Sequence, residues 1–168
     1  KLTTEAVNLN SLEIDSLATL ELVQLINRED RQVAEAVSRA AAQIAAAVEI
    51  VVQRLSNGGR LIYIGAGTSG RLGVLDASEC PPTFSTPPGM IVGLIAGGDR
   101  ALRNAIEGAE DSLTQAAEDL SAVNLAACDC VMGIATSGRT PYVLGGLRFA
   151  RSLGCGTLGH TCNATSEM

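Results

Sequence analysis

The sequence predicts an α/β fold, a three-layer αβα sandwich with a parallel sheet, preceded by N-terminal helices. Short apolar runs alternate with helical patterns from residue 61 onward, and this alternation is typical of parallel sheets with helices on their faces. The tetrapeptide Thr-Ser-Gly-Arg also occurs twice, at residues 68–71 and 136–139, each time directly after an apolar run. Parallel sheets bind ligands at the carboxyl ends of their strands, so the repeat predicts a binding site.

Helical spacing marks the N-terminal part of the chain. Apolar residues between positions 3 and 27 predict a short helix that ends at the charged run Arg28-Glu29-Asp30. From Arg31 to Leu55 apolar side chains recur mostly at three- and four-residue steps, and Asn57-Gly58-Gly59 supplies a left-handed stop. We therefore expect one long amphipathic helix, whose apolar stripe must pack against the sheet domain or a second copy of the chain.

The remaining elements follow from the alternating patterns. The run Leu61 to Gly67 predicts the first strand. Further strands are expected at residues 90–96, 130–135 and 156–161, and helices at residues 100–120 and 141–153.

Each Thr-Ser-Gly-Arg copy marks a strand that runs into a helix start. The first N–H groups of a helix have no intrahelical partner, and the helix dipole adds partial positive charge, so an anion fits there. Hydroxyl groups can add hydrogen bonds, and glycine permits close approach. A simpler interpretation is that the Ser and Thr side chains only cap helices. We favour a shared phosphate site, with these candidate residues: Gly67, Thr68, Ser69, Gly70, Arg71, Thr136, Ser137, Gly138, Arg139 and Thr140.

The roles of the two arginines stay open at this stage, because Arg71 and Arg139 could pair with phosphate or with nearby acids such as Asp76. His160, the lone histidine, is expected at the end of a strand and is interpreted as structural.

Composition excludes several classes of protein. A net charge of −6, the absence of Trp and only two Tyr and two Phe argue against a nucleic-acid surface. No run reaches membrane-spanning length without polar residues and no signal-peptide pattern is found, so we expect a cytoplasmic protein without a membrane partner. The spacing of Cys128 and Cys130 suits neither zinc nor a redox pair, and the five cysteines are interpreted as mostly structural, reduced thiols.

A dinucleotide fingerprint is present but incomplete. Gly65, Gly67 and Gly70 satisfy the G-x-G-x-x-G spacing. The fingerprint also needs an acidic residue about twenty positions further on, where this chain has a proline-rich stretch at residues 81–88, interpreted as a loop. Asp99 comes too late, so we expect no nicotinamide or flavin cofactor.

Five segments together closely resemble the N-acetylmuramic acid 6-phosphate etherases, a family with the sugar isomerase (SIS) fold: Gly65–Arg71, Leu75–Thr83, Gly93–Gly98, Glu107–Ser112 and Ser137–Pro141. The resemblance extends upstream to residues 16–20 and 26–30, so it covers almost the whole chain. It implies that residues 58–168 are an SIS phosphosugar-binding domain that is truncated at its C-terminus. Residues 1–57 are then a helical segment that packs on this domain or on a partner subunit.

The resemblance also implies a reaction, because the family cleaves the lactyl ether of N-acetylmuramic acid 6-phosphate to N-acetylglucosamine 6-phosphate and D-lactate without a metal or other cofactor. By motif matching, Glu79 is the proton donor and Glu110 the second catalytic carboxylate, and Ser78 joins the substrate-binding residues. A donor must stay protonated, which burial and a like-charged neighbour would favour. The family's active site lies at a homodimer interface, so a homodimer is expected.

Three alternatives remain. The chain could be a non-catalytic phosphosugar sensor of the glucokinase-regulator type, an aldose–ketose isomerase of the same fold, or an inactive fragment that self-associates. Glu79 and Glu110 favour the etherase over the sensor, and the absence of a usable histidine argues against the isomerase. The chain departs from the family at His160 and at Thr161-Cys162-Asn163-Ala164, where the loop after the fourth strand is expected.

Overall fold

The computed structural model describes residues 3–168 and divides into two compact units, the first ending at Val48 and the second beginning at Glu49. The boundary between residues 57 and 58 that the sequence suggests stays a prediction.

The first unit is helical, and its longest helix differs from the expected one. Its elements are three short 3-10 helices, η1 (Thr3–Glu5), η2 (Leu9–Ser11) and η3 (Ile14–Ser16), the helix α1 (Thr19–Arg39), and the start of α2 (Ala41–Ser56).

The predicted helix end at residues 28–30 is wrong, because α1 passes through the charged run without interruption. Arg and Glu are good helix formers, and a charged run without Gly or Pro does not stop a helix. The side-chain amides of Asn8 and Asn10 donate to the Glu29 carboxylate at 2.8 and 2.9 Å. The helical stretch instead breaks at Ala40 (φ −93°, ψ 6°), so the single helix predicted from Arg31 to Leu55 is also wrong.

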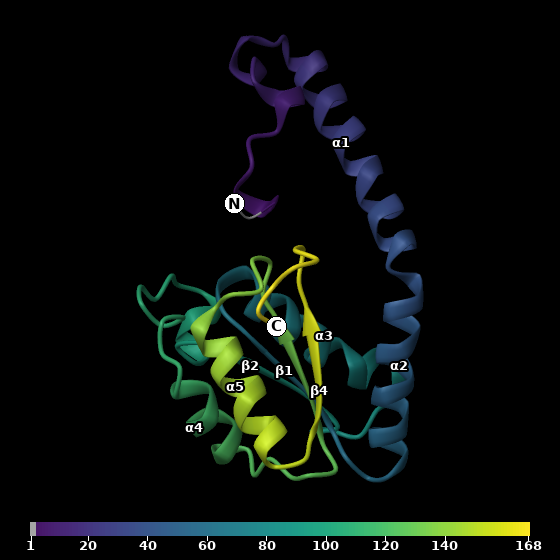
Figure 1. The fold of residues 1–168 in the computed structure, drawn as a ribbon, viewed down its shortest axis with the longest axis vertical. Coiled ribbons are helices and arrows are strands. Elements are labelled where there is room, and N and C mark those ends of the chain that lie inside the picture. The colour runs from purple at the N-terminus through teal and green to yellow at the C-terminus, as the bar shows by residue number, and fades with distance from the viewer. Residues whose placement is uncertain (1–2) are drawn as a thin grey trace. The chain divides into compact units, whose positions relative to one another are not determined.

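The second unit holds a four-stranded parallel sheet in the order β2-β1-β3-β4 (Figure 1). Its strands are β1 (Leu61–Gly65), β2 (Ile91–Ile95), β3 (Cys130–Ile134) and β4 (Gly156–His160). All four predicted strands are therefore confirmed, with ends that differ by one or two residues. The apolar, partly β-branched composition of these runs suits strands that helices cover on both faces.

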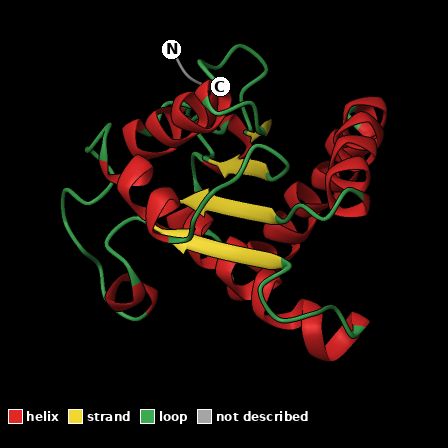
Figure 2. Cartoon of the chain, turned by 90° about the horizontal axis from the view of Figure 1, so that it is seen from below, coloured by secondary structure: helices red, strands yellow, loops and turns green. Residues whose placement is uncertain are grey.

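Helices cover both faces of the sheet (Figure 2). On one face lies α3 (Gly67–Phe84), which packs on β1, β2 and β3. On the other lie α4 (Gln115–Ala122) and α5 (Pro141–Ser152), where α5 contacts β1, β3 and β4. The predicted αβα sandwich is therefore confirmed.

Strand alternation explains which residues meet each helix layer, because successive side chains point to opposite faces. Ile62 and Ile64 are fully buried and belong to the core cluster that includes Tyr142 and Val143 of α5. The intervening residue, Tyr63, faces α3, where a Cβ added at Gly73 would lie 2.8 Å from the Tyr63 Cβ. Glycine at this position therefore lets the helix approach the strand closely.

Two helix predictions need correction in this unit. Residues 100–120 do not form one helix: they begin within the 3-10 helix η4 (Asp99–Leu102), turn irregularly, and enter α4 only at Gln115. Gly108 interrupts the stretch with φ +71°, and the Ser112 hydroxyl accepts from the Gln115 N–H at 3.1 Å, which starts α4.

The proline stretch contains the second correction. Pro81 and Pro82 lie inside α3, not in a loop, and the helix continues to Phe84. It ends at Ser85, which has a left-handed φ of +56° and donates its N–H to the Pro81 carbonyl. The proline stretch therefore no longer argues against a dinucleotide site. The remaining argument is the position of Asp99, which lies in η4 beyond the end of β2, too far along the chain for the acidic residue of the fingerprint.

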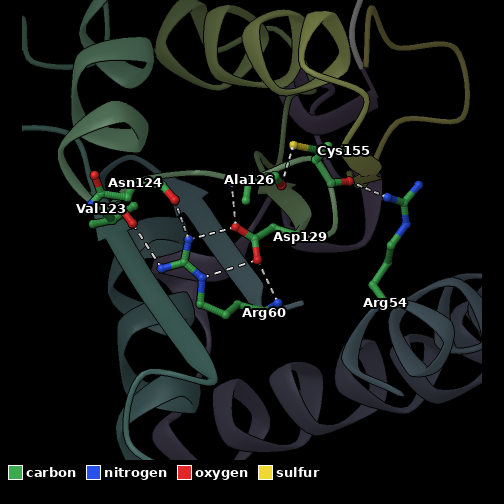
Figure 3. A network of polar contacts seen from close by, with 8 residues as sticks. Arg54, Arg60, Val123, Asn124, Ala126, Asp129 and Cys155 are labelled. Atoms are coloured by element: carbon green, nitrogen blue, oxygen red, sulfur yellow. Dashed lines mark hydrogen bonds and ion pairs between the residues drawn. The ribbon is translucent and has the colours of Figure 1, made fainter. Parts of the chain in front are cut away.

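A polar network ties the amino ends of β1 and β3 together (Figure 3). The Arg60 guanidinium donates to Asp129 from Nη2 at 2.7 Å and Nε at 3.2 Å, and the Arg60 backbone N–H donates at 2.8 Å. The same guanidinium binds the carbonyls of Val123 and Asn124, each at 3.0 Å, just beyond α4. A fourth hydrogen bond to Asp129 comes from the Ala126 N–H at 2.9 Å. Each oxygen of the buried Asp129 carboxylate therefore accepts two hydrogen bonds, and the contact with the Arg60 guanidinium is bidentate.

The network makes a prediction about stability and pH. Burial by itself would raise the pKa of Asp129, but the hydrogen bonds from Arg60 and Ala126 outweigh it, so the pKa lies below its ordinary value. The stabilisation is therefore complete above the unfolded pKa of about 3.9 and is lost as the pH falls through the lower folded pKa. We expect Asp129→Asn to reduce the free energy of unfolding by about 3 kcal/mol in urea titrations at pH 7.

The matched control is Glu118→Gln, which removes an exposed carboxylate of α4. It should leave unfolding within about 0.5 kcal/mol of the original chain. Equal effects of the two changes at pH 7 would contradict the role given to the network.

Candidate active site

The two Thr-Ser-Gly-Arg copies meet at the point where the sheet reverses its winding direction. From β1 the chain proceeds to β2 on one side, and from β3 it proceeds to β4 on the other. The carboxyl ends of β1 and β3 are adjacent, because Gly65 is the partner of Ile134 in their ladder. In open α/β sheets ligands bind at such a switch point, so the topology brings both predicted loops to one place.

The first copy forms the opening turn of α3. The helix starts at Gly67, which has φ +53° and open space around it, and its N-cap is Ala66, which offers no capping side chain. Gly70 is buried, and a Cβ there would lie 2.6 Å from the Ile95 Cγ1 and 2.7 Å from the Gly65 oxygen. The glycines at positions 65 and 70 therefore serve close packing of helix on strand, while Gly67 leaves the backbone open to a ligand.

The second copy forms a turn that precedes α5. Gly138 adopts φ +69° and donates its N–H to the Ala135 carbonyl at 2.9 Å, and the Arg139 N–H donates to the Ser137 hydroxyl at 3.2 Å. Thr140 is the N-cap of α5, and Pro141 occupies the first turn. The two copies thus differ: one lies within a helix and the other before one.

Neither α3 nor α5 has a side-chain N-cap bond from Thr68, Ser69 or Thr140, and the Ser137 hydroxyl accepts from Arg139 in the turn before α5 begins. Across residues 3–168, the side-chain hydroxyls of Thr68, Ser69, Thr136 and Thr140 make no hydrogen bond to the protein. They stand beside N–H groups at the starts of two helices, which carry partial positive charge. The arrangement offers hydrogen-bond donors to an anion from two adjacent loops.

The segment after β4 supports the second loop, which the sequence analysis did not foresee. The buried Asn163 donates from Nδ2 to the carbonyls of Thr136 and Ser137, each at 3.1 Å. Thr161 and Cys162 also donate to the Thr136 carbonyl, at 3.2 and 3.1 Å. No local sequence signal could have shown these contacts, because the carbonyls that accept from Thr161 and Asn163 lie 25 to 27 residues earlier in the chain. His160 ends β4 and is exposed, and its carbonyl accepts from the Ala135 N–H.

Glu110 lies next to the second loop. It is exposed in the irregular segment between η4 and α4, and its backbone carbonyl accepts from the Tyr142 N–H in the first turn of α5 at 3.0 Å. The Tyr142 ring is fully buried, and its hydroxyl donates to Asp119 at 2.7 Å. Burial raises the pKa of Tyr142, and the bond to Asp119 adds to this, so the phenol stays a donor. This pair anchors α5, and α5 in turn holds Glu110 at the loops.

Glu79 and Ser78 lie elsewhere in the chain. Glu79 comes twelve residues after Gly67 in α3, about 18 Å along the axis at 1.5 Å per residue. Its side chain is exposed, and the Ser78 hydroxyl donates back to the Leu75 carbonyl at 2.7 Å. Glu110 is exposed as well. The single chain therefore does not bury a proton donor, contrary to the expectation, and it brings together the loops and Glu110 but not Glu79.

The two repeat arginines have different surroundings. The Arg71 guanidinium donates to the carbonyls of Leu102 at 3.1 Å and Asn104 at 3.4 Å. Arg139 is exposed, and its Nε lies 3.8 Å from Glu167. Asp76, considered as a partner for Arg71, instead accepts from the Tyr63 hydroxyl at 2.8 Å. Burial, followed by this hydrogen bond, raises the pKa of Tyr63.

Comparison with protein families decides the classification. The profile of the glucokinase regulatory protein N-terminal SIS domain matches residues 43–151, which include both loops and both glutamates. The chain belongs to this SIS family. A phosphoheptose isomerase from Francisella tularensis has the same fold, with a TM-score of 0.68 at 22% identity, over 86% of this chain and 76% of that one.

Curated relatives of this SIS domain share much higher identity. An N-acetylmuramic acid 6-phosphate etherase from Rhodopirellula baltica is 60% identical over all 168 residues, which are 56% of that protein. The etherase from Actinobacillus pleuropneumoniae is also 60% identical over 168 residues, 55% of its length. The chain thus spans about half the length of the curated relatives it matches.

The described residues contain neither a membrane-spanning helix nor a cluster of metal-ligating side chains. Among residues 3–168, no helix is both long and apolar enough to span a membrane. Over the same range no group of His, Cys, Asp and Glu side chains is arranged to hold a metal ion. The five cysteines are free, with Cys130 and Cys155 buried.

Proposed function

We propose that this SIS domain takes part in cleaving the D-lactyl ether of N-acetylmuramic acid 6-phosphate, giving N-acetylglucosamine 6-phosphate and D-lactate. The observation that carries the proposal is 60% identity, over the whole of this chain, to proteins named for that etherase activity. The chain retains the two carboxylates and two phosphate loops that such a reaction requires. The proposal implies a carbon–oxygen lyase in the recycling of cell-wall amino sugars.

The chemistry needs an acid and a base but no electron transfer. Opening the sugar ring gives an aldehyde that makes the C2 proton acidic, so that removal of this proton allows the C3–O bond to break. Lactate leaves as the ether oxygen accepts a proton, and a C2–C3 double bond forms. Water then adds, its oxygen bonding to C3 and a proton returning to C2. Glu79 acts as the proton donor and Glu110 as the second carboxylate, and the same pair serves both halves.

The phosphate group binds at the switch point in this proposal. Helix N-termini and exposed hydroxyl groups supply hydrogen-bond donors to it without a metal. The proposed contacts are Gly67, Thr68, Ser69, Gly70, Thr136, Ser137, Gly138, Arg139 and Thr140. Arg71 is left out because its Nε and Nη2 donate to the backbone carbonyls of Leu102 and Asn104.

A homodimer follows from the position of Glu79. A phosphorylated sugar held at the loops is too short to reach a carboxylate that lies about 18 Å along α3, so we propose that Glu79, with Ser78, serves the site of a second copy. Leu72 and Leu75 support this, since each is 56% exposed and shares a helix face with Glu79 at three- and four-residue steps. A partner covering this face would also supply the burial that a proton donor needs.

The reduced state of the cysteines suits the cytoplasm, where we place the protein.

A phosphosugar sensor is the second candidate, favoured by the description of the matching family as the regulatory protein's SIS domain. The sensor would bind the sugar phosphate without releasing lactate.

The proposed roles of Glu79 and Glu110 can be tested by the rate of lactate release. We expect the chain to release D-lactate from N-acetylmuramic acid 6-phosphate, and Glu79→Gln and Glu110→Gln each to lower kcat by at least about a hundredfold, because each removes a proton-transferring group. Coupled lactate detection measures the rate, and circular dichroism confirms folding of each variant. Tight binding of the substrate without lactate from the original chain would favour the sensor.

In the proposed dimer, each active site takes Glu110 from one chain and Glu79 from the other. Mixing inactive Glu79→Gln and Glu110→Gln chains should restore about a quarter of the original activity, because half of the C2 dimers would be mixed and one of their two sites would be intact. Lactate release is measured after the mixture has been left to exchange subunits, which is verified by native mass spectrometry of differently labelled chains. A mixture that forms mixed dimers but stays inactive would show that each site takes both glutamates from one chain.

A further inference from the structure

We propose that Arg71 is a positioning residue that holds the Glu110 segment in place, whereas its repeat partner, Arg139, lies exposed at the second loop. The segment comprises residues 103–114, between η4 and α4. This inference rests on the proposed function and deepens it, because it assigns different tasks to the arginines of two identical tetrapeptides.

The geometry of Arg71 carries the inference. The residue is half-buried in the first turn of α3, and its donors Nε and Nη2 point to the carbonyls of Leu102 and Asn104, at 3.1 and 3.4 Å. Within residues 3–168 no carboxylate forms an ion pair with Arg71. The guanidinium is a planar fork that can bind two acceptors at once, and here both acceptors belong to backbone where the Glu110 segment begins.

The far side of the segment is held by α5. The Tyr142 N–H binds the Glu110 carbonyl at 3.0 Å, and a Cβ added at Gly145 would collide with the Leu113 carbonyl. Between these two supports, Ile106 and Ala109 pack toward Gly97, and their Cβ atoms each lie 3.3 Å from a Cβ built on that glycine. The segment contains no strand and no α-helix, so Arg71 supplies the side-chain tether at its N-terminal end.

This arrangement links the two phosphate loops to the catalytic carboxylate. Arg71 directly follows the hydroxyl residues Thr68 and Ser69 and the glycine Gly70 of the first loop, while the second loop leads into α5. A phosphate that fixes both loops would therefore fix both supports of Glu110. Arg139 has a different environment, because it is exposed and its Nε lies 3.8 Å from the Glu167 carboxylate.

The first arm of the test needs no activity. Hydrogen exchange is measured by NMR in the original chain, in Arg71→Gln, and in Arg151→Gln as a control that removes an exposed arginine at the end of α5. We expect exchange at the Asn104, Ala109 and Asp111 amides to rise at least about tenfold in Arg71→Gln, while the amides of β1 and β3 change less than twofold. Unchanged exchange in the segment would overturn the proposal.

The second arm separates positioning from phosphate binding. With the sugar phosphate as substrate, Arg71→Gln should lower kcat by at least about tenfold and change KM by less than threefold, whereas Arg139→Gln should mainly raise KM. Arg71→Lys should recover little of the lost kcat, because an ammonium group cannot donate to two carbonyls with the planar geometry of a guanidinium. A raised KM with unchanged kcat for Arg71→Gln would make it a phosphate ligand and overturn the inference. Absence of lactate from the original chain would count against the proposed function, and the exchange result would still decide the tether.

Discussion

The parallel pairing of β1 with β3 is the constraint on which the proposed site depends. Register in a buried strand pair is strongly specified, because a shift of one residue would exchange the two faces. The observed register pairs Gly65 with Ile134 and thereby sets the two Thr-Ser-Gly-Arg copies side by side. Neither loop alone offers more than an ordinary helix start, and their combination at a switch point makes an anion site plausible on physical grounds.

The two ends of the sheet have different roles, since contacts at the amino ends of the strands stabilise the fold and the proposed ligand site lies at their carboxyl ends. At the amino ends, Arg60 and Asp129 form a satisfied ionic network that ties β1, β3 and the end of α4 together. At the carboxyl ends, the Thr68 hydroxyl has no partner within residues 3–168, and the space beside the left-handed Gly67 is open. The rigid end holds the strands in register, so the open end can present donors at fixed positions to a ligand.

The sequence predicts the strands well because their signals are local. Apolar runs and the repeated tetrapeptide locate β1 and β3, and the resemblance identifies the SIS fold. The helices were less predictable: charge alone did not end α1 at residues 28–30, and the 100–120 pattern did not reveal the left-handed turn at Gly108. The contacts of Arg71 and Asn163 depend on residues 26 to 33 positions away in sequence, so no local pattern could show them.

The most direct test of the shared site is a titration of the ¹⁵N-labelled chain with N-acetylglucosamine 6-phosphate, followed by NMR. The account predicts that the amides of residues 67–70 and those of residues 137–140 shift together and fit one dissociation constant, since one phosphate contacts both loops. The non-phosphorylated sugar at equal concentration should leave both sets in place. Shifts confined to one loop, or two different dissociation constants, would contradict the claim that the repeats form a single site.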